Sequence, residues 1–230
     1  IKSLTGVWKE EHVFELEQSY SIYQFYHAKL KECDAKIEEH LREKSGVDTF
    51  VEPQKKEKSN KNNLNFNGKE MLYELTGTDL AEIFGITETN AIEIISEVGL
   101  DMSKWPTVKH FTSWLNLAPN NKISGGKVLS SRIPKKKNHA GQIFRMAAFA
   151  IQRSKNWLAM FYNRIKAKNG APKAIVATAR KIAAIFYKMI KERVKFNPIP
   201  IEKYMDGFKE NQIKKLKRQA KNLGLQIVEM

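Results

Sequence analysis

The apolar positions of this chain follow a helical period almost throughout. Between Glu10 and Lys44 there is no proline or glycine, and one series of positions recurs at alternating spacings of four and three. These positions are Leu16, Tyr20, Tyr23, His27, Leu30, Asp34, Ile37 and Leu41. Such a heptad seam predicts a long helix that pairs with another helix, from a second copy of the chain. A long amphipathic helix packed on its own domain is an equal alternative, because His27 and Asp34 interrupt the seam.

The composition changes after this helix. Residues 45–69 are dominated by lysine, asparagine, serine and glutamate, which predicts a polar linker. We therefore expect a dimerisation segment at 1–44 and a helical domain at 70–230.

The remaining apolar residues also fall on helical stripes. We expect two short helices joined by a tight turn between Glu70 and Gly99, with Trp105, Phe111 and Trp114 as core residues of the next helix. Further helices are expected over 101–117, over 141–162, from Pro172 onward, and over 204–222. The last part of the 141–162 segment can also fold as a separate helix. Strand signals are minimal, so the predicted fold class is all-α.

The tight turn in the first pair of helices has two interpretations. The sequence around Gly85 and Thr87 resembles a helix-hairpin-helix, in which backbone N–H groups of a glycine-containing turn bind a DNA phosphate. Thr87 stands where such hairpins usually have a second glycine. A helical hairpin used only for packing explains the pattern equally well.

The net charge of +15 is unevenly distributed. Residues 1–102 carry a net charge of −8, residues 103–195 carry +20, and residues 196–230 carry +3. Glu192 is the only acidic residue of the middle segment. A folded polycation needs a polyanion, which predicts nucleic acid as the partner. A membrane surface is disfavoured, because the cations are spread over several predicted helices rather than one amphipathic helix.

Candidate chemistry is concentrated between two of the predicted helices. Ser124 is followed by Gly125 and Gly126 and flanked by Lys122 and Lys127. Paired glycines let backbone N–H groups approach an anion closely, and the lysines add charge at the same place. The loop therefore suits a phosphate group. The other candidate nucleic-acid contacts are basic or amide side chains further along, namely Arg132, Lys135, Lys136, Lys137, Asn138 and Arg145.

The sequence offers no metal site of its own. Cys33 is the only cysteine, which excludes an internal disulfide and a cysteine-rich zinc site and fits a reducing, cytoplasmic environment. With Glu192 as its single carboxylate, the basic segment cannot build a two-metal site. The first residue is Ile1, so we expect a fragment of a longer protein. No signal peptide and no membrane span are predicted.

Several motifs together resemble a known family. They are Trp114–Pro119 (WLNLAP), Lys122–Ser130 (KISGGKVLS), Gly170–Lys173 (GAPK) and Ala179–Lys181 (ARK). In this order they are similar to the C-terminal domain of the Piv-type DEDD insertion-sequence transposases, the IS-one-ten family. The resemblance covers about Tyr73 to Met230, and the long helix before it matches the coiled coil that precedes this domain in the family.

This resemblance implies an enzyme that cuts and rejoins DNA under the guidance of a structured RNA. It also implies that Ser124 is the nucleophile. The divalent metal, Mg²⁺, would be bound by four acids of a RuvC-like nuclease domain that is absent from this chain, so the fragment alone should be inactive. The expected location is the bacterial cytoplasm, associated with the nucleoid. Thr87 and Lys137 depart from the family pattern, where many relatives have glycine.

Two alternative hypotheses assign the chain a different kind of function. The chain can be a non-catalytic helical module that binds DNA or RNA and dimerises, or a structural adaptor that pairs through residues 10–44. The adaptor hypothesis does not explain the net charge of +20 on residues 103–195.

Overall fold

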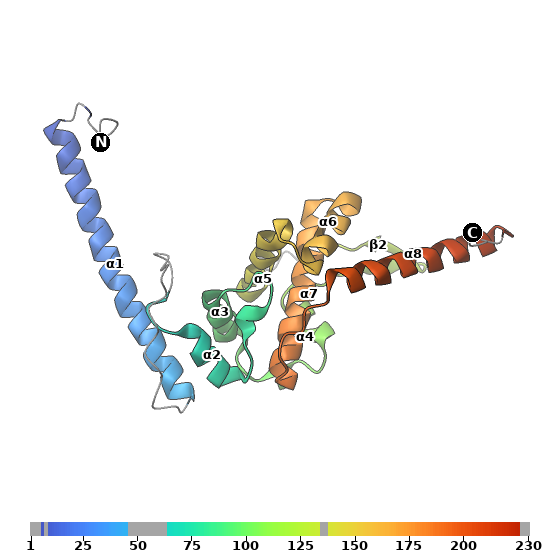
Figure 1. Cartoon of the computed structure of the whole chain (residues 1–230), viewed down its shortest axis with the longest axis horizontal. Coiled ribbons are helices and arrows are strands. Elements are labelled where there is room, and N and C mark those ends of the chain that lie inside the picture. The colour runs from blue at the N-terminus through green and yellow to red at the C-terminus, as the bar shows by residue number, and fades with distance from the viewer. Residues whose placement is uncertain (1–5, 7–8, 46–63, 134–137, 226–230) are drawn as a thin grey trace. The chain divides into compact units, whose positions relative to one another are not determined.

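A computed structural model describes residues 6, 9–45, 64–133 and 138–225 (Figure 1). Helices dominate these residues, and the all-α prediction is confirmed. The α-helices are α1 (Glu10–Ser45), α2 (Gly68–Thr76), α3 (Glu88–Val98), α4 (Val108–Trp114), α5 (His139–Ala150), α6 (Trp157–Asn169), α7 (Ala171–Glu192) and α8 (Ile201–Asn222). The short 3-10 helices are η2 (Leu80–Glu82), η3 (Met102–Lys104) and η4 (Ile151–Arg153). The strands are β1 (Lys122–Ser124) and β2 (Lys127–Ser130). Among the described helices, none is long and apolar enough to cross a membrane.

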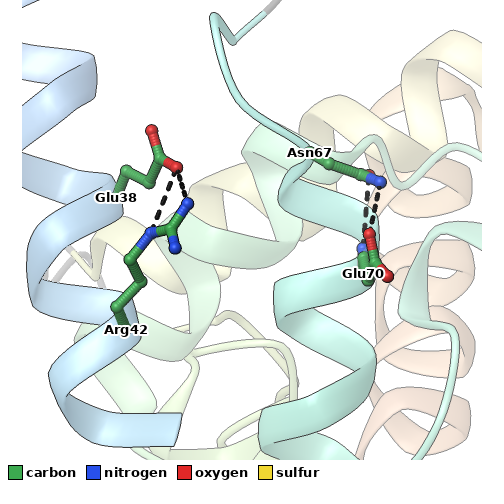
Figure 2. A network of polar contacts seen from close by, with 4 residues as sticks. All are labelled: Glu38, Arg42, Asn67 and Glu70. Carbon is green, nitrogen blue, oxygen red and sulfur yellow. Dashed lines mark hydrogen bonds and ion pairs between the residues drawn. The ribbon is translucent and has the colours of Figure 1, made fainter. Parts of the chain in front are cut away.

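The chain forms two compact units, residues 1–75 and 76–230. In the first unit, α1 confirms the predicted long helix. The acidic residues of its first turn and the basic residues of its last turn interact favourably with the helix dipole. Glu38 and Arg42, one turn apart, add a hydrogen-bonded ion pair with Nη2 2.5 Å from Oε1 (Figure 2).

The start of α2 is capped by its own sequence. Asn67 accepts a hydrogen bond from the backbone N–H of Glu70 at 3.4 Å and donates one to the Glu70 carboxylate at 2.8 Å (Figure 2). The first of these bonds satisfies one of the backbone N–H groups that the first helical turn leaves free, and the second ties the two side chains together. Most of the predicted linker, residues 46–63, lies outside the described residues.

The heptad seam of α1 has two different parts. Leu16, Tyr20 and Leu30 are 68%, 58% and 60% exposed, so the described residues leave this part of the seam uncovered. Asp34 is half-buried, and its carboxylate accepts hydrogen bonds from the backbone N–H and the side-chain amide of Asn65, at 3.2 and 2.6 Å. Asp34, a polar residue of the seam, therefore forms hydrogen bonds within its own chain.

In the second unit, α7 lies at the centre and contacts α4, α5 and α6 (Figure 1). Tilted and edge-on ring pairs connect α4, α5 and α7. Phe111 of α4 lies 6.5 Å from Phe144 of α5 and 5.5 Å from Tyr187 of α7, measured between ring centroids. Phe144 in turn contacts Phe186 edge-on at 5.4 Å. These buried rings form the core that holds the elements carrying the candidate site.

Three predicted helices are shorter or divided in the structure, at places that the apolar period does not mark. The first of the predicted pair ends at Thr76, and Leu80–Glu82 form only the 3-10 turn η2. Pro106 precedes α4 rather than opening it, since α4 begins after Thr107. Asn156 accepts a hydrogen bond from the N–H of Ala159 at 2.9 Å and starts α6, which divides the expected 141–162 helix. The predictions for α7, with Pro172 in its first turn, and for α8 are confirmed.

Trp114 was predicted as core and is 40% exposed. It ends α4, and its ring lies 5.0 Å from that of Trp105, which is buried. The prediction followed the helical period, but the helix stops here and the side chain lies at the edge of the core.

Candidate nucleic-acid interface

The segment predicted to be a loop contains a β-hairpin. Strands β1 and β2 are antiparallel, with Ile123 opposite Val128 and Ser124 opposite Lys127. Gly125 and Gly126 form the two-residue turn with φ of 54° and 73°. Two consecutive positive φ values are typical of the tight turn that matches the twist of a two-stranded ribbon, and they favour glycine. Open space surrounds both glycines, so the backbone conformation, and not crowding, requires them.

The hairpin presents Ser124 and two lysines together. Lys122 and Ser124 are two residues apart on β1 and so share a face, while Lys127 is directly opposite Ser124. Directly opposed side chains in a ribbon have their Cβ atoms about 5 Å apart. All three residues are exposed. A phosphate group at the Ser124 hydroxyl would therefore be within reach of at least one ammonium group.

A bulge lies further along the ribbon. Lys122 is opposite Ser130, so Leu129 is the extra residue in β2. Leu129 and Ile123 are 71% and 63% exposed. The backbone N–H of Asn120 donates to the carbonyl of Arg132 at 3.1 Å, which continues the pairing beyond the strands. Arg132 is exposed, so its charge is available to a ligand.

The base of the hairpin is held by contacts between the end of α4 and the start of α5. Asn138 accepts a hydrogen bond from the N–H of Gly141 at 2.7 Å and donates one to the carbonyl of Trp114 at 3.1 Å. A Cβ atom on Gly141 would lie 2.1 Å from the carbonyl oxygen of Leu115, so only glycine allows this approach. We call the residues that make these contacts the hairpin root: Trp114, Leu115, Asn116, Asn138, Gly141 and Arg145.

Arg145 belongs to the root through its guanidinium group. Its Nη2 donates to the carbonyl oxygen of Asn116 at 2.8 Å. Partial burial lowers the pKa of Arg145, because the charged form is poorly solvated there. Asn116 is buried and has a φ of 55°, a left-handed conformation uncommon outside glycine. The charge of Arg145 therefore helps to fix the chain that leads into the hairpin.

The predicted binding residues thus fall into groups with different environments. Lys122, Gly125, Gly126, Lys127 and Arg132 lie on or beside the exposed hairpin around Ser124. Asn138 and Arg145 lie in the root, where both are hydrogen-bonded to backbone groups. Residues 135–137, which include the predicted contacts Lys135, Lys136 and Lys137, lie outside the described residues.

The turn at Gly85 packs against another helix. A Cβ atom there would lie 2.6 Å from the carbonyl oxygen of Ala147 and 2.7 Å from Cγ2 of Ile151, and φ is +85°. Thr87 caps α3, since its hydroxyl accepts a hydrogen bond from the N–H of Asn90 at 3.2 Å. Packing and capping account for both residues without a ligand.

Acidic groups are few around the hairpin. One carboxylate lies beside the root, where Oε1 of Glu97 is 3.5 Å from Nδ1 of His139. The described residues contain no group of three or more His, Cys, Asp or Glu side chains that could hold a metal ion. The divalent metal that the resemblance implies would be held outside this chain, and the hairpin itself presents a hydroxyl beside cations.

Sequence reasoning missed the hairpin and Asn116. The hairpin had a signal, because a Gly-Gly pair between short runs containing isoleucine, valine and leucine is typical of a tight β-turn. Asn116 had none, since its left-handed backbone is set by the contacts of the root.

Comparison with known protein families matches residues 77–163 to the model described as "Transposase IS116/IS110/IS902 family". The match covers less than half of the chain. It begins at the turn after α2, ends within α6 and includes the entire hairpin and its root. No curated protein matches the chain.

Proposed function

We propose that this chain acts in DNA transposition, and that its second unit binds DNA and supplies Ser124 as the nucleophile for strand cleavage. The family match over residues 77–163 supports the general role. The observation that carries the specific role is the position of Ser124, exposed on a glycine-turned hairpin and directly opposite Lys127.

In this reaction the Oγ atom of Ser124 attacks a phosphodiester of the DNA backbone. The Oγ–P bond forms, the P–O bond to the leaving strand breaks, and the hydroxyl proton passes to a base. Lys127 and Lys122 stabilise the charge that develops on the phosphate oxygens. The hairpin has no carboxylate to accept the proton, so the base must come from outside the hairpin.

We further propose that a RuvC-like nuclease domain, outside this chain, completes the site and brings its divalent metal. A guide RNA and a second copy joined through α1 are the other proposed partners. The separation of acidic and basic segments supports a composite site, since neither the hairpin nor its root holds an acid.

The test is strand exchange by the full-length protein that contains this chain, with Ser124→Ala. Ser130→Ala is the matched control, because Ser130 lies on the partner strand and its hydroxyl accepts a hydrogen bond from the N–H of Arg132 at 3.4 Å. Ser124→Ala should abolish exchange and keep DNA affinity, while Ser130→Ala keeps both. Strand exchange by Ser124→Ala at the wild-type rate would falsify the proposed nucleophile.

The alternative is a nucleic-acid-binding module without chemistry of its own. Contacts within the protein explain Gly85, Thr87 and Asn138 without a bound nucleic acid. The exposed hairpin cations can bind nucleic acid whether or not Ser124 is a nucleophile. Under the alternative, Ser124→Ala leaves exchange unchanged and removal of the hairpin lysines lowers only affinity.

A further inference from the structure

A second set of cations lies where α6, α7 and α8 meet, outside the hairpin and its root. The guanidinium carbon of Arg164 lies 4.5 Å from the ring centroid of Phe208, 5.4 Å from that of Phe161 and 5.6 Å from that of Tyr204. One arginine of α6 is therefore enclosed by a ring of its own helix and two rings of α8. Contacts of this kind favour a cation over neutral groups.

Lys181 of α7 joins the same group. Its Nζ atom lies 4.8 Å from the ring centroid of Phe161 and 5.7 Å from that of Trp157. Phe161 is thus shared by two cations. We call the residues involved the cation–aromatic cluster: Trp157, Phe161, Arg164, Lys181, Tyr204 and Phe208.

The two cations of the cluster have no acidic partner. Within the described residues, neither Arg164 nor Lys181 forms an ion pair, whereas Lys188 on α7 lies 3.7 Å from Glu192. Burial against the rings and then the positive charge of Arg164 lower the pKa of Lys181. Both charges lie beside the ring of Phe161, and no acid among the described residues neutralises either one, so the positive potential there favours an anion.

The cluster also has polar atoms without partners. The indole Nε1 of Trp157, a residue only 6% exposed, and the hydroxyl of Tyr204 have no hydrogen-bond partner among the described residues. The indole N–H can only donate. Among the described residues, the cluster therefore has more hydrogen-bond donors and positive charge than acceptors to match them.

We propose that the cation–aromatic cluster binds one phosphodiester group of a nucleic-acid strand, as an anchor separate from the hairpin. Arg164 and Lys181 supply the charge, and the aromatic rings hold both side chains in place before binding. This site rests on the proposed function, since it assumes a nucleic-acid partner. The excess of cations over residues 103–195, with one acid among them, makes a polyanion the partner with the matching charge.

The experiment measures the affinity of the 230-residue chain for fluorescent duplex DNA and for single-stranded RNA across a series of salt concentrations. Lys181→Met removes the charge and keeps an apolar side chain against Phe161. Lys188→Met is the matched control on the same helix, because its ammonium is already paired with Glu192. Among the described residues, the cation–π contacts of Lys181 are with rings of α6, so we expect this variant to keep α8 docked.

Each lost phosphate contact should reduce the slope of log affinity against log salt by about one unit. We expect this reduction for Lys181→Met and none for Lys188→Met. Arg164→Met should reduce this slope by a similar amount, and Arg164→Lys should keep the wild-type slope. Thermal melts check that each variant is folded. If the slope changes for DNA alone or for RNA alone, that nucleic acid is the one bound at the cluster.

The outcomes separate the two proposals. A wild-type chain that binds nucleic acid and shows the same slope after Lys181→Met overturns the anchor and leaves the proposed function standing. Equal losses in Lys181→Met and Lys188→Met also overturn it, because net charge alone would then explain the effect. A chain that binds no nucleic acid at all contradicts the proposed function and the anchor with it.

Discussion

Asn138 accepts a hydrogen bond at the start of α5 and donates another to the end of α4. Replacing it with alanine should lower the free energy of unfolding by about 1–2 kcal/mol, the usual cost of losing a helix cap. Asn156→Ala removes the cap of α6 and is the matched control. Urea unfolding should show a loss for both variants, but only Asn138→Ala should also weaken DNA binding, because it loosens the hairpin root. Unchanged stability of Asn138→Ala would contradict this structural role.

Two glycines test the packing of the second unit. Gly141→Ala should lower the free energy of unfolding by about 1–3 kcal/mol, since the new Cβ would lie 2.1 Å from the Leu115 carbonyl oxygen. Gly207→Ala meets nothing within 4 Å inside α8 and should raise helix stability by about 0.5–1 kcal/mol. Chemical denaturation of the two variants gives the comparison. Equal behaviour would mean that α4 and α5 do not approach as closely as described.

The hairpin is the element on which the proposed chemistry depends. Replacing both Gly125 and Gly126 with alanine should cost about 1–2 kcal/mol for each residue forced to positive φ, and a lone two-stranded ribbon has little stability to lose. Gly125→Asn is the control, because asparagine followed by glycine is favoured in this turn. Amide NMR should show loss of the pairing between residues 123 and 128 in the double variant and its retention in Gly125→Asn. Pairing that survives the double alanine change would contradict the described turn.

The uncovered seam of α1 predicts association through a second copy. Leu30→Glu should convert a dimer to a monomer, because it places a charge on the seam. Ile22→Glu is the matched control, since Ile22 is 56% exposed on the same helix but lies off the seam. Sedimentation of the 230-residue chain measures both. A wild-type chain that sediments as a monomer, or equal effects of the two variants, would contradict pairing through this face.

The elements also show what the sequence can predict. The long helix α1, α7 with its early proline and the all-α class follow from local periodicity and turn residues, and all three were predicted. The packing of Gly85 against Ala147 was not, because it depends on residues distant in sequence. The cap at Asn156 and the end of α4 are local, but the apolar period alone does not mark them. For the candidate site, the residues of the exposed hairpin were identified by type and spacing, but the root contacts of Arg145 with Asn116 could not be.

Across the chain, charge and chemistry are divided between segments. The acidic N-terminal part contains the seam of α1, the basic part contains the hairpin and the cation–aromatic cluster, and the described residues hold no candidate metal cluster. We propose that the second unit binds nucleic acid at several points and presents the Ser124 hydroxyl to the backbone. The proposed nuclease domain would supply the base and the divalent metal that the hairpin lacks.

The central claim is a covalent bond between Ser124 and DNA. It is tested most directly by incubating the full-length protein with labelled element-end DNA, denaturing the mixture, and mapping any protein–DNA adduct by peptide mass spectrometry. We expect an adduct on the peptide that contains Ser124, absent from Ser124→Ala and present in Ser130→Ala. An adduct on another residue, or cleavage of the DNA with no adduct at any time, would contradict it.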